Sequence, residues 1–145
     1  MSPLVRRLMT AVRKGAVLAY RRSGGKLGGK ALGGSPVLLL TVKGRNTGVP
    51  RTTPVSWFPH EGGYVVVGSG GGSAGDPQWF RNLRRAATAE VEVGRDRHTV
   101  TVRELKGAER TQVWRDVVIA STPAFARYPA KAGRDIPLAL LTPVS

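Results

Sequence analysis

The sequence of 145 residues contains no cysteine, which excludes disulfide bonds, thiolate metal sites and a cysteine nucleophile. It has two histidines, and neither has a partner at metal-ligand spacing, so we expect no metal site. The longest apolar runs, VLLLTV and IPLALLTPV, are well short of the ~20 residues needed to cross a bilayer, and no apolar signal region follows the N-terminal charges. We therefore expect one domain in the cytoplasm, free or peripheral at the inner face of the membrane.

Acidic residues are also scarce, and their scarcity is uneven. The chain carries 23 Lys and Arg against nine Asp and Glu, a net charge of +14. Residues 1–30 hold eight of the basic residues and no acid, so the rest of the chain has 15 basic and nine acidic groups. Such an excess attracts either an anionic surface or an anionic ligand.

The N-terminal residues have the pattern of an amphipathic basic helix. At 100° per residue, apolar side chains share one arc and basic side chains the other. The apolar arc comprises Leu4, Val5, Leu8, Met9, Val12, Ala16, Ala19 and Tyr20, and the basic arc Arg6, Arg7, Arg13, Lys14 and Arg21. The helix could pack on the core through its apolar arc, lie on a membrane surface through residues 1–22, or contact nucleic acid. Nucleic acid is disfavoured because Tyr20 is the sole aromatic residue among the charges.

A glycine-rich segment follows this helix and predicts a flexible linker. Residues 24–30 match the phosphate-loop spacing GxxxxGK, but Ala31 stands where the magnesium-binding Ser or Thr belongs. A second glycine-rich match, GxGxxG over residues 70–75, lacks the chain length for the βαβ repeats of a dinucleotide-binding domain. We therefore divide the chain into a helix and linker, residues 1–30, and a folded domain, residues 31–145.

From Val37 onward the pattern is mainly that of strands. β-branched or alternating runs are separated by Gly, Pro, Asn and Asp, and residues 88–105 predict an antiparallel hairpin with one solvated face. Asp76 followed by Pro77 predicts the start of a helix, with Asp76 as its N-cap. A mainly β, α+β domain follows, with a small mixed sheet or barrel and flanking helices.

Four segments, in the same order, resemble the deazaflavin-dependent nitroreductase family of actinobacterial proteins. They are SPVLLLTVKGRNTGVPRTTPVSWF, the glycine-rich segment after YVVVGS, DPQWFRNLRR and RDIPLALLTPV. The resemblance covers about residues 20–145 and implies a split β-barrel of mostly antiparallel strands. It also implies binding of coenzyme F420, a deazaflavin that bears a phosphate and an oligoglutamate tail. The basic turn GRNTGVPR would then face an anionic cofactor.

The resemblance also implies roles for individual residues. Contacts to the phosphate and tail would come from Arg45, Asn46, Thr47 and Arg51. The deazaflavin ring would lie along Pro54, Gly68 and Ser69, and the helix start that meets the cofactor would contain Gln78 and Trp79. From the residues alone, the same positions fit an ordinary charged turn and a core aromatic pair.

Two departures from the family pattern bear on affinity and substrate. Asn46 stands where the family commonly has lysine, and the segment after the third strand lacks a further lysine; Arg81, Arg84 and Arg85 could compensate. Of three substrate-facing tyrosines in the nitroreductase, Tyr128 alone matches, and Thr122 and Phe125 occupy the other places. We expect an apolar substrate pocket formed by Trp57, Phe125 and Tyr128, to which Trp114 could contribute. The catalytic proton would come from Tyr128 or from water.

The expected function is hydride transfer from reduced coenzyme F420 to a small apolar electrophile, such as a quinone, an enone or a nitro compound. One alternative keeps the split barrel and exchanges the cofactor for flavin mononucleotide, FMN. Another is a basic module that binds nucleic acid or a membrane surface without catalysis, which a steep salt dependence would reveal for nucleic acid. A third alternative is a protein that binds the cofactor without turnover, which the loss of two tyrosines leaves open. Both a monomer and a homodimer are compatible with the sequence.

Overall fold

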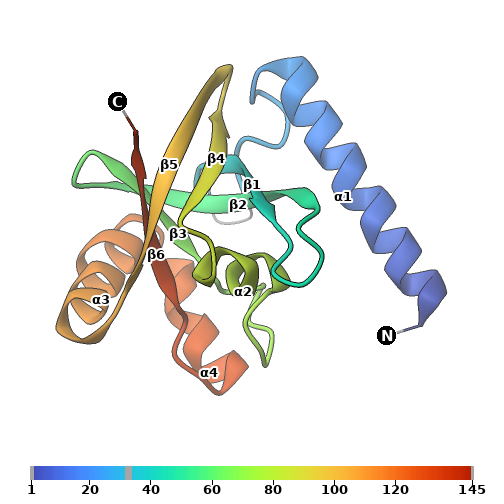
Figure 1. Ribbon diagram of the computed structural model, residues 1–145. Coiled ribbons are helices and arrows are strands. Elements are labelled where there is room, and N and C mark those ends of the chain that lie inside the picture. Colours follow the sequence, from blue (N-terminus) through green and yellow to red (C-terminus); the bar gives the residue numbers. More distant parts are fainter. Residues whose placement is uncertain (1, 32–33, 145) are drawn as a thin grey trace.

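A closed barrel of antiparallel strands forms the body of the molecule (Figure 1). The computed structural model describes residues 2–31 and 34–144. Within them the strand order is β1-β2-β3-β6-β5-β4, and β1 also pairs with β4. The strands are β1 (Val37–Lys43), β2 (Pro50–His60), β3 (Gly63–Val67), β4 (Thr88–Val93), β5 (Asp96–Leu105) and β6 (Leu138–Pro143). The predicted mainly β, α+β barrel is confirmed.

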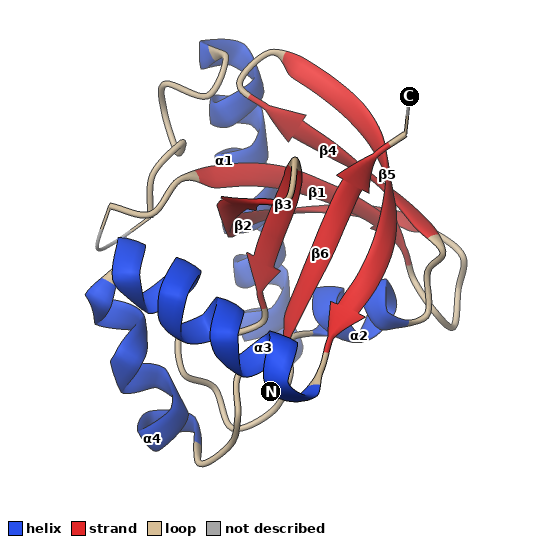
Figure 2. Ribbon diagram, turned by 90° about the vertical axis from the view of Figure 1, so that its left-hand side faces the viewer, coloured by secondary structure: helices blue, strands red, loops and turns tan. Residues whose placement is uncertain are grey.

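Helices cover the barrel on two opposite sides and at one end (Figures 1 and 2). Helix α1 lies on one side, the helices after β5 lie on the other, and α2 precedes β4. Their bounds are α1 (Pro3–Ser23), α2 (Gln78–Arg84), α3 (Gly107–Val113), the π-helix η1 (Trp114–Ile119), the 3₁₀-helix η2 (Pro123–Arg127) and α4 (Tyr128–Ala132). No helix in the described part of the chain is long and apolar enough to span a membrane.

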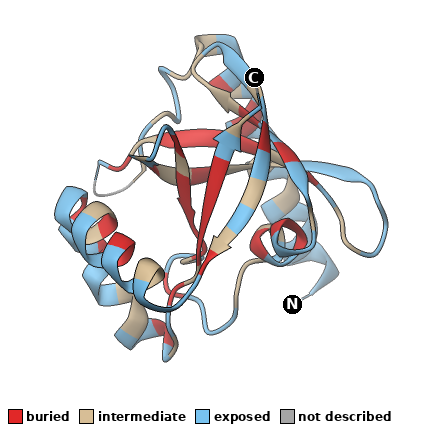
Figure 3. Ribbon diagram, turned by 60° about the vertical axis from the view of Figure 1, so that its left-hand side comes forward, coloured by how far each residue is buried: buried red, intermediate tan, exposed pale blue. Residues whose placement is uncertain are grey.

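Buried residues are concentrated along the strands and on parts of the helices (Figure 3). Because side chains alternate along a strand, they build separate cores inside and outside the barrel. Val55 and Val66 point into the interior, where Phe80 and Leu83 of α2 join them. Their neighbours on the other face, including Phe58 and Val65, pack against η1, η2 and α4. One face of β2 therefore lines the barrel interior, and the other packs against the helices outside the barrel.

The hairpin predicted over residues 88–105 is present. Strand β4 pairs with β5 in the register Val91↔His98, and Ala89, Val91 and Val100 are buried while Glu90 and Thr99 are exposed. The prediction for Asp76 is wrong, because Pro77 is the N-cap of α2 and no side chain caps the helix. Asp76 instead receives hydrogen bonds from two arginines, which draw its carboxylate away from the helix start.

Helix α1 packs on the barrel through its C-terminal half. The buried hydroxyl of Tyr20 donates to the carbonyl of Val37 at 3.0 Å and accepts from the N–H of Gly94 at 2.9 Å. Arg21 makes two hydrogen bonds to the carboxylate of Glu92, at 3.0 and 2.8 Å. Residues from strands β1 and β4 and from the turn after β4 therefore hold this half of the helix.

The N-terminal part of the apolar arc of α1 does not face the core, and of the arc's residues Tyr20 alone is buried, so the interpretation of a helix packed through the whole arc is wrong. Leu4, Leu8 and Val12 expose 77%, 63% and 64% of their surface. The arc turned toward the barrel contains Thr10, Arg13 and Val17, at intervals of three and four residues. Residues 1, 32, 33 and 145 lie outside the described residues. The predicted division of the chain at residue 30 therefore stays a prediction.

Candidate functional site

The turn between β1 and β2 places Arg45 against helix α2. The backbone N–H and Nη1 of Arg45 both donate to Oδ1 of Asn82, at 3.1 and 2.8 Å. Nη2 of Arg45 donates to Oε1 of Gln78 at 2.9 Å. These neutral acceptors orient the guanidinium without cancelling its charge, and they use two of its five N–H donors. Arg45 is therefore fixed and still able to bind an anion.

The other residues of this turn have local structural roles. Oγ1 of Thr47 accepts from the N–H of Val49 at 3.2 Å, and a Cβ at Gly44 would come within 2.6 Å of the same oxygen. Gly48 has a φ of +72°, which favours glycine. Asn46 and Thr47 are exposed at the tip of the turn. The turn would form without a ligand, and it brings Asn46 and Thr47 to the same end of the barrel as Arg45.

Arg51 lies opposite Val42 in the β1–β2 register, and Thr53 lies opposite Leu40. Both line a hollow of about 130 Å³ that also contacts the start of α2 at Gln78 and Trp79. Arg13 of helix α1 enters the same hollow from the other side. Burial in the first place, and the neighbouring charge of Arg51 in the second, lower the pKa of Arg13. Two like charges thus meet at one hollow.

Within residues 2–31 and 34–144, no carboxylate lies within 4.0 Å of the guanidinium groups of Arg13, Arg45 or Arg51. Other arginines of the chain, such as Arg21 and Arg84, are paired. The three arginines without a carboxylate partner and the α2 side chains beside them form one group, which we call the basic cradle. It comprises Arg13, Arg45, Arg51, Gln78, Trp79 and Asn82.

A larger hollow, of about 750 Å³, is lined by residues of the same turn. Lys43, Arg45, Asn82 and Arg85 are among its lining residues, so the two hollows share Asn82. Of the three arginines expected to compensate for the missing lysines, Arg85 lines this hollow and Arg84 is bound to Glu104 and Asp76. Arg85 is thus placed to add charge here, whereas the charge of Arg84 is largely cancelled.

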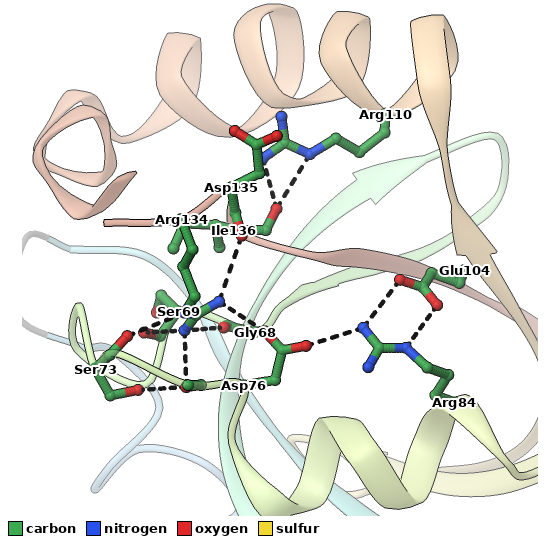
Figure 4. A network of polar contacts seen from close by, with 11 residues as sticks. Gly68, Ser69, Ser73, Asp76, Arg84, Glu104, Arg110, Arg134, Asp135 and Ile136 are labelled. Atoms are coloured by element: carbon green, nitrogen blue, oxygen red, sulfur yellow. Dashed lines mark hydrogen bonds and ion pairs between the residues drawn. The ribbon is translucent and has the colours of Figure 1, made fainter. Parts of the chain in front are cut away.

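The loop between β3 and α2 is held by a network centred on Arg134 (Figure 4). Its Nη1 donates to Oδ1 of Asp76 at 2.7 Å, and its Nη2 donates to the carbonyls of Gly68 and Ser69 at 3.3 and 3.4 Å. A Cβ at Gly68 would come within 2.8 Å of both Phe80 and Pro137, so close packing explains this glycine. The network fixes the path of the chain from β3 to the cradle.

Aromatic side chains gather on the outer face of the barrel. The ring of Tyr128 meets that of Phe125 edge-on, with centroids 5.1 Å apart, and Phe58 lies 5.7 Å from Phe125. Trp57 does not join them: it packs against Tyr64 at 5.0 Å and belongs to the interior core. Because neighbouring residues of a strand point to opposite faces, Trp57 and Phe58 cannot share one pocket.

The remaining expected ring contact is also placed apart from the cradle. Pro54 lies opposite Leu39, and Leu39 packs with Val17 and Tyr20 on the outer side of β1. Arg51 and Thr53 lie on the other face of β2. Tyr128 and Phe125 line neither hollow of the cradle, although α4 is tied to the β3–α2 loop by Lys131, whose Nζ donates to the carbonyl of Gly71 at 3.0 Å.

The chemistry of the basic cradle fits an anionic ligand. Guanidinium groups bind phosphate and carboxylate oxygens in pairs, and Trp79 offers an apolar surface beside them. The structure therefore defines a class, an antiparallel β-barrel protein whose basic cradle suits an anionic ligand.

Comparison with known proteins identifies the family. The sequence model of the F420H(2)-dependent quinone reductase family matches residues 12–143, and the chain belongs to this family of oxidoreductases. It is similar to the F420H(2)-dependent quinone reductase Rv1261c of Mycobacterium tuberculosis, with 30% identity over 125 residues, 85% of this chain and 84% of that protein.

Two solved structures are also similar. One, an F420-H2 dependent reductase termed FDR-A, has a TM-score of 0.65 and 32% identity over 73% of this chain and 93% of its own. The other, described as a domain-swapped dimer, has a TM-score of 0.68 and 28% identity over 97% of this chain and 99% of its own. The resemblance drawn from the sequence is confirmed, as is the expectation of a coenzyme F420-dependent oxidoreductase.

Three residues of the site were missed by the sequence reasoning. Asn82 and Arg134 hold the turn and the loop, and Arg13 enters the cradle from α1. Asn82 gave a weak signal, since it lies four residues after Gln78 on one face of the same helix. Arg13 gave none, because its position depends on how α1 docks.

Proposed function

We propose that the protein binds coenzyme F420 at the basic cradle and reduces an apolar quinone, with enones and nitro compounds as further acceptors. The observation that supports this most is the set of three arginines without a carboxylate partner among the described residues, gathered where α2 begins. When bound in its reduced form, the cofactor would supply the hydride.

The residues of the cradle would divide the binding of the cofactor among them. Arg45 and Arg51 would hold its anionic oxygens, Gln78 would keep Arg45 in position, and Asn46 and Thr47 would contact the ligand from the turn. Trp79 would pack against it. Gly68 and Ser69 would border the ring, on a loop that Arg134 holds in place. The role assigned to Pro54 stays a prediction.

Tyr128 is the proposed proton donor to the reduced substrate. Its ring rests against Phe125, beside Phe58, so the phenol lies at the border of an apolar cluster. A phenol is a weak acid at neutral pH, and charge that develops on the substrate oxygen would drive the transfer. Trp57, on the other face of β2, would not share this pocket.

Oxidation of reduced coenzyme F420 by the purified protein tests this function. Menadione, cyclohexenone and nitrobenzene would be offered as acceptors in parallel, and turnover with menadione is expected to be the fastest. Arg51→Gln is expected to raise the KM for the cofactor about tenfold with little change in kcat, because it removes a binding charge. No oxidation with any acceptor by the wild-type protein would refute the reductase.

We propose further that the apolar arc of α1 lies on an anionic membrane surface, where apolar quinones dissolve. The exposed side chains of Leu4, Leu8, Met9 and Val12 support this, together with the basic residues of the same helix. The double substitution Leu8→Gln with Val12→Gln is expected to abolish sedimentation with phosphatidylglycerol liposomes. Leu27→Gln, also an exposed leucine but outside the helix, serves as control. Unchanged sedimentation of the double variant would exclude the membrane role.

Of the two oligomeric states that the sequence left open, we propose the homodimer. The domain-swapped dimer among the similar structures supports it. Light scattering after gel filtration is expected to give twice the chain mass of 15.5 kDa. A mass equal to one chain would exclude the homodimer.

A further inference from the structure

Helix α1 turns part of its basic arc, Arg13, Lys14 and Arg21, toward the barrel. Beyond the small hollow of the cradle, a second hollow of about 600 Å³ runs between α1 and the start of β2. Arg13 and Arg51 line both hollows, so the two meet at this pair. The second hollow is also lined by Lys14 and Arg21, and its apolar residues include Val17 and Pro50.

The charges along this second hollow are poorly compensated. Arg21, at one end, is bound to Glu92 and anchors the helix. Among the described residues, neither Arg13 nor Lys14 has a carboxylate within 4.0 Å. Holding two arginines together in a partly buried place costs free energy unless an anion lies between them. Burial and the charge of Arg51 lower the pKa of Arg13, which is the sign of that cost.

From this geometry we infer that α1 forms one wall of the cofactor site, and that the groove between α1 and β2 binds the distal anionic chain of the ligand through Arg13, Lys14 and Arg51. This rests on the proposed function. An extended chain with several carboxylates or phosphates fits, because Arg13 and Arg51 line both hollows while Lys14 and Arg21 line the second hollow alone. Val17 and Pro50 would contact the methylene groups between the charges.

Binding of two forms of the deazaflavin tests this assignment. Oxidised coenzyme F420 carries the phosphate and the glutamates, whereas its deazaflavin riboside lacks both. Arg13→Gln is expected to weaken binding of F420 about tenfold and to leave the riboside within about twofold of wild type. Arg22→Gln is the matched control, since Arg22 is an exposed arginine of the same helix and lines neither hollow. It is expected to change neither constant.

Equal affinity of Arg13→Gln and wild type for F420 would overturn the inference, and so would an equal loss for the riboside. Tripolyphosphate, followed by tryptophan fluorescence because Trp79 lines the hollow, provides a second measurement. If tripolyphosphate binds in a way that depends on Arg13 but F420 does not bind, the groove binds anions and the proposed cofactor is refuted. No binding of tripolyphosphate and no binding of F420 would refute both.

Discussion

Replacing Asn82 by aspartate separates the charge of the basic cradle from its shape. Oδ1 of Asn82 accepts two hydrogen bonds from Arg45, at 3.1 and 2.8 Å, and the side chain is buried. Aspartate has nearly the same size and keeps the acceptor oxygen for both hydrogen bonds, but it places a full negative charge beside the guanidinium. We expect a stability close to that of wild type, because the new carboxylate is paired with Arg45, and weaker binding of an anionic cofactor.

The size of the effect follows from Coulomb's law. An anion on the outer edge of Arg45 would lie about 6 Å from the new carboxylate, which gives about 2.8 kcal/mol of repulsion at an effective dielectric constant of about 20. Arg45 is partly exposed and salt screens the charges, so we expect about half of this, ~1.4 kcal/mol, or about a tenfold increase in Kd.

Titration of oxidised coenzyme F420 at low and high ionic strength measures this increase, which should shrink as salt is added. The control is Gln112→Glu, which adds the same charge at an exposed position of α3. If Asn82→Asp binds F420 within about twofold of wild type, or if the control loses as much, the cradle does not act through its charge.

Three further predictions concern the contacts that hold the site. Tyr20→Phe should lower the free energy of unfolding by about 2 kcal/mol, since the N–H of Gly94 and the carbonyl of Val37 lose a buried partner. Urea denaturation measures this, and a change below about 0.5 kcal/mol would contradict the docking of α1. Asp76→Asn should cost about 1–2 kcal/mol because it leaves Arg84 and Arg134 without this carboxylate, and hydrogen exchange in residues 68–76 should rise with it; equal exchange would exclude the bracing role. The hydrogen bonds from Arg21 in the first place hold the pKa of Glu92 below its ordinary value, so the pair stabilises the fold at neutral pH and this stabilisation is lost as the pH falls through the lowered pKa. Wild type should therefore exceed Glu92→Gln by about 0.5–1 kcal/mol at pH 7, and this difference should shrink as the pH falls through the lowered pKa; a difference that grows on acidification would reverse the sign of the linkage.

The strands and the basic turn could be predicted from local patterns. The hairpin over residues 88–105 follows from the alternation of valines with polar residues, which is a property of adjacent positions in the sequence. The assignment of Arg45 and Arg51 to one end of the barrel also follows, because the turn and the first residues of the next strand lie together in sequence.

The predictions are wrong where a residue distant in sequence determines the position of a side chain or helix. Asp76 has the form of an N-cap, but Arg134, 58 positions later, binds its carboxylate. The apolar arc of α1 predicts burial along its whole length. Instead Tyr20 and Arg21 dock the C-terminal end of the helix through contacts to Glu92, 72 and 71 positions away, and Leu4, Leu8 and Val12 stay exposed. Trp57 and Phe58 are both aromatic, and composition does not tell which of them contacts Phe125. The orientation of β2 in the barrel turns Phe58 to that face and Trp57 to the interior.

The measurement that tests the central claim most directly is a fluorescence titration of the purified protein with oxidised coenzyme F420, beside FMN at the same ionic strength. The basic cradle predicts a Kd for F420 in the micromolar range or tighter and much weaker binding of FMN, which carries fewer negative charges. Equal or tighter binding of FMN would contradict the proposed cofactor. Binding of neither, with a steep loss of nucleic-acid binding as salt rises, would instead identify a basic binding module.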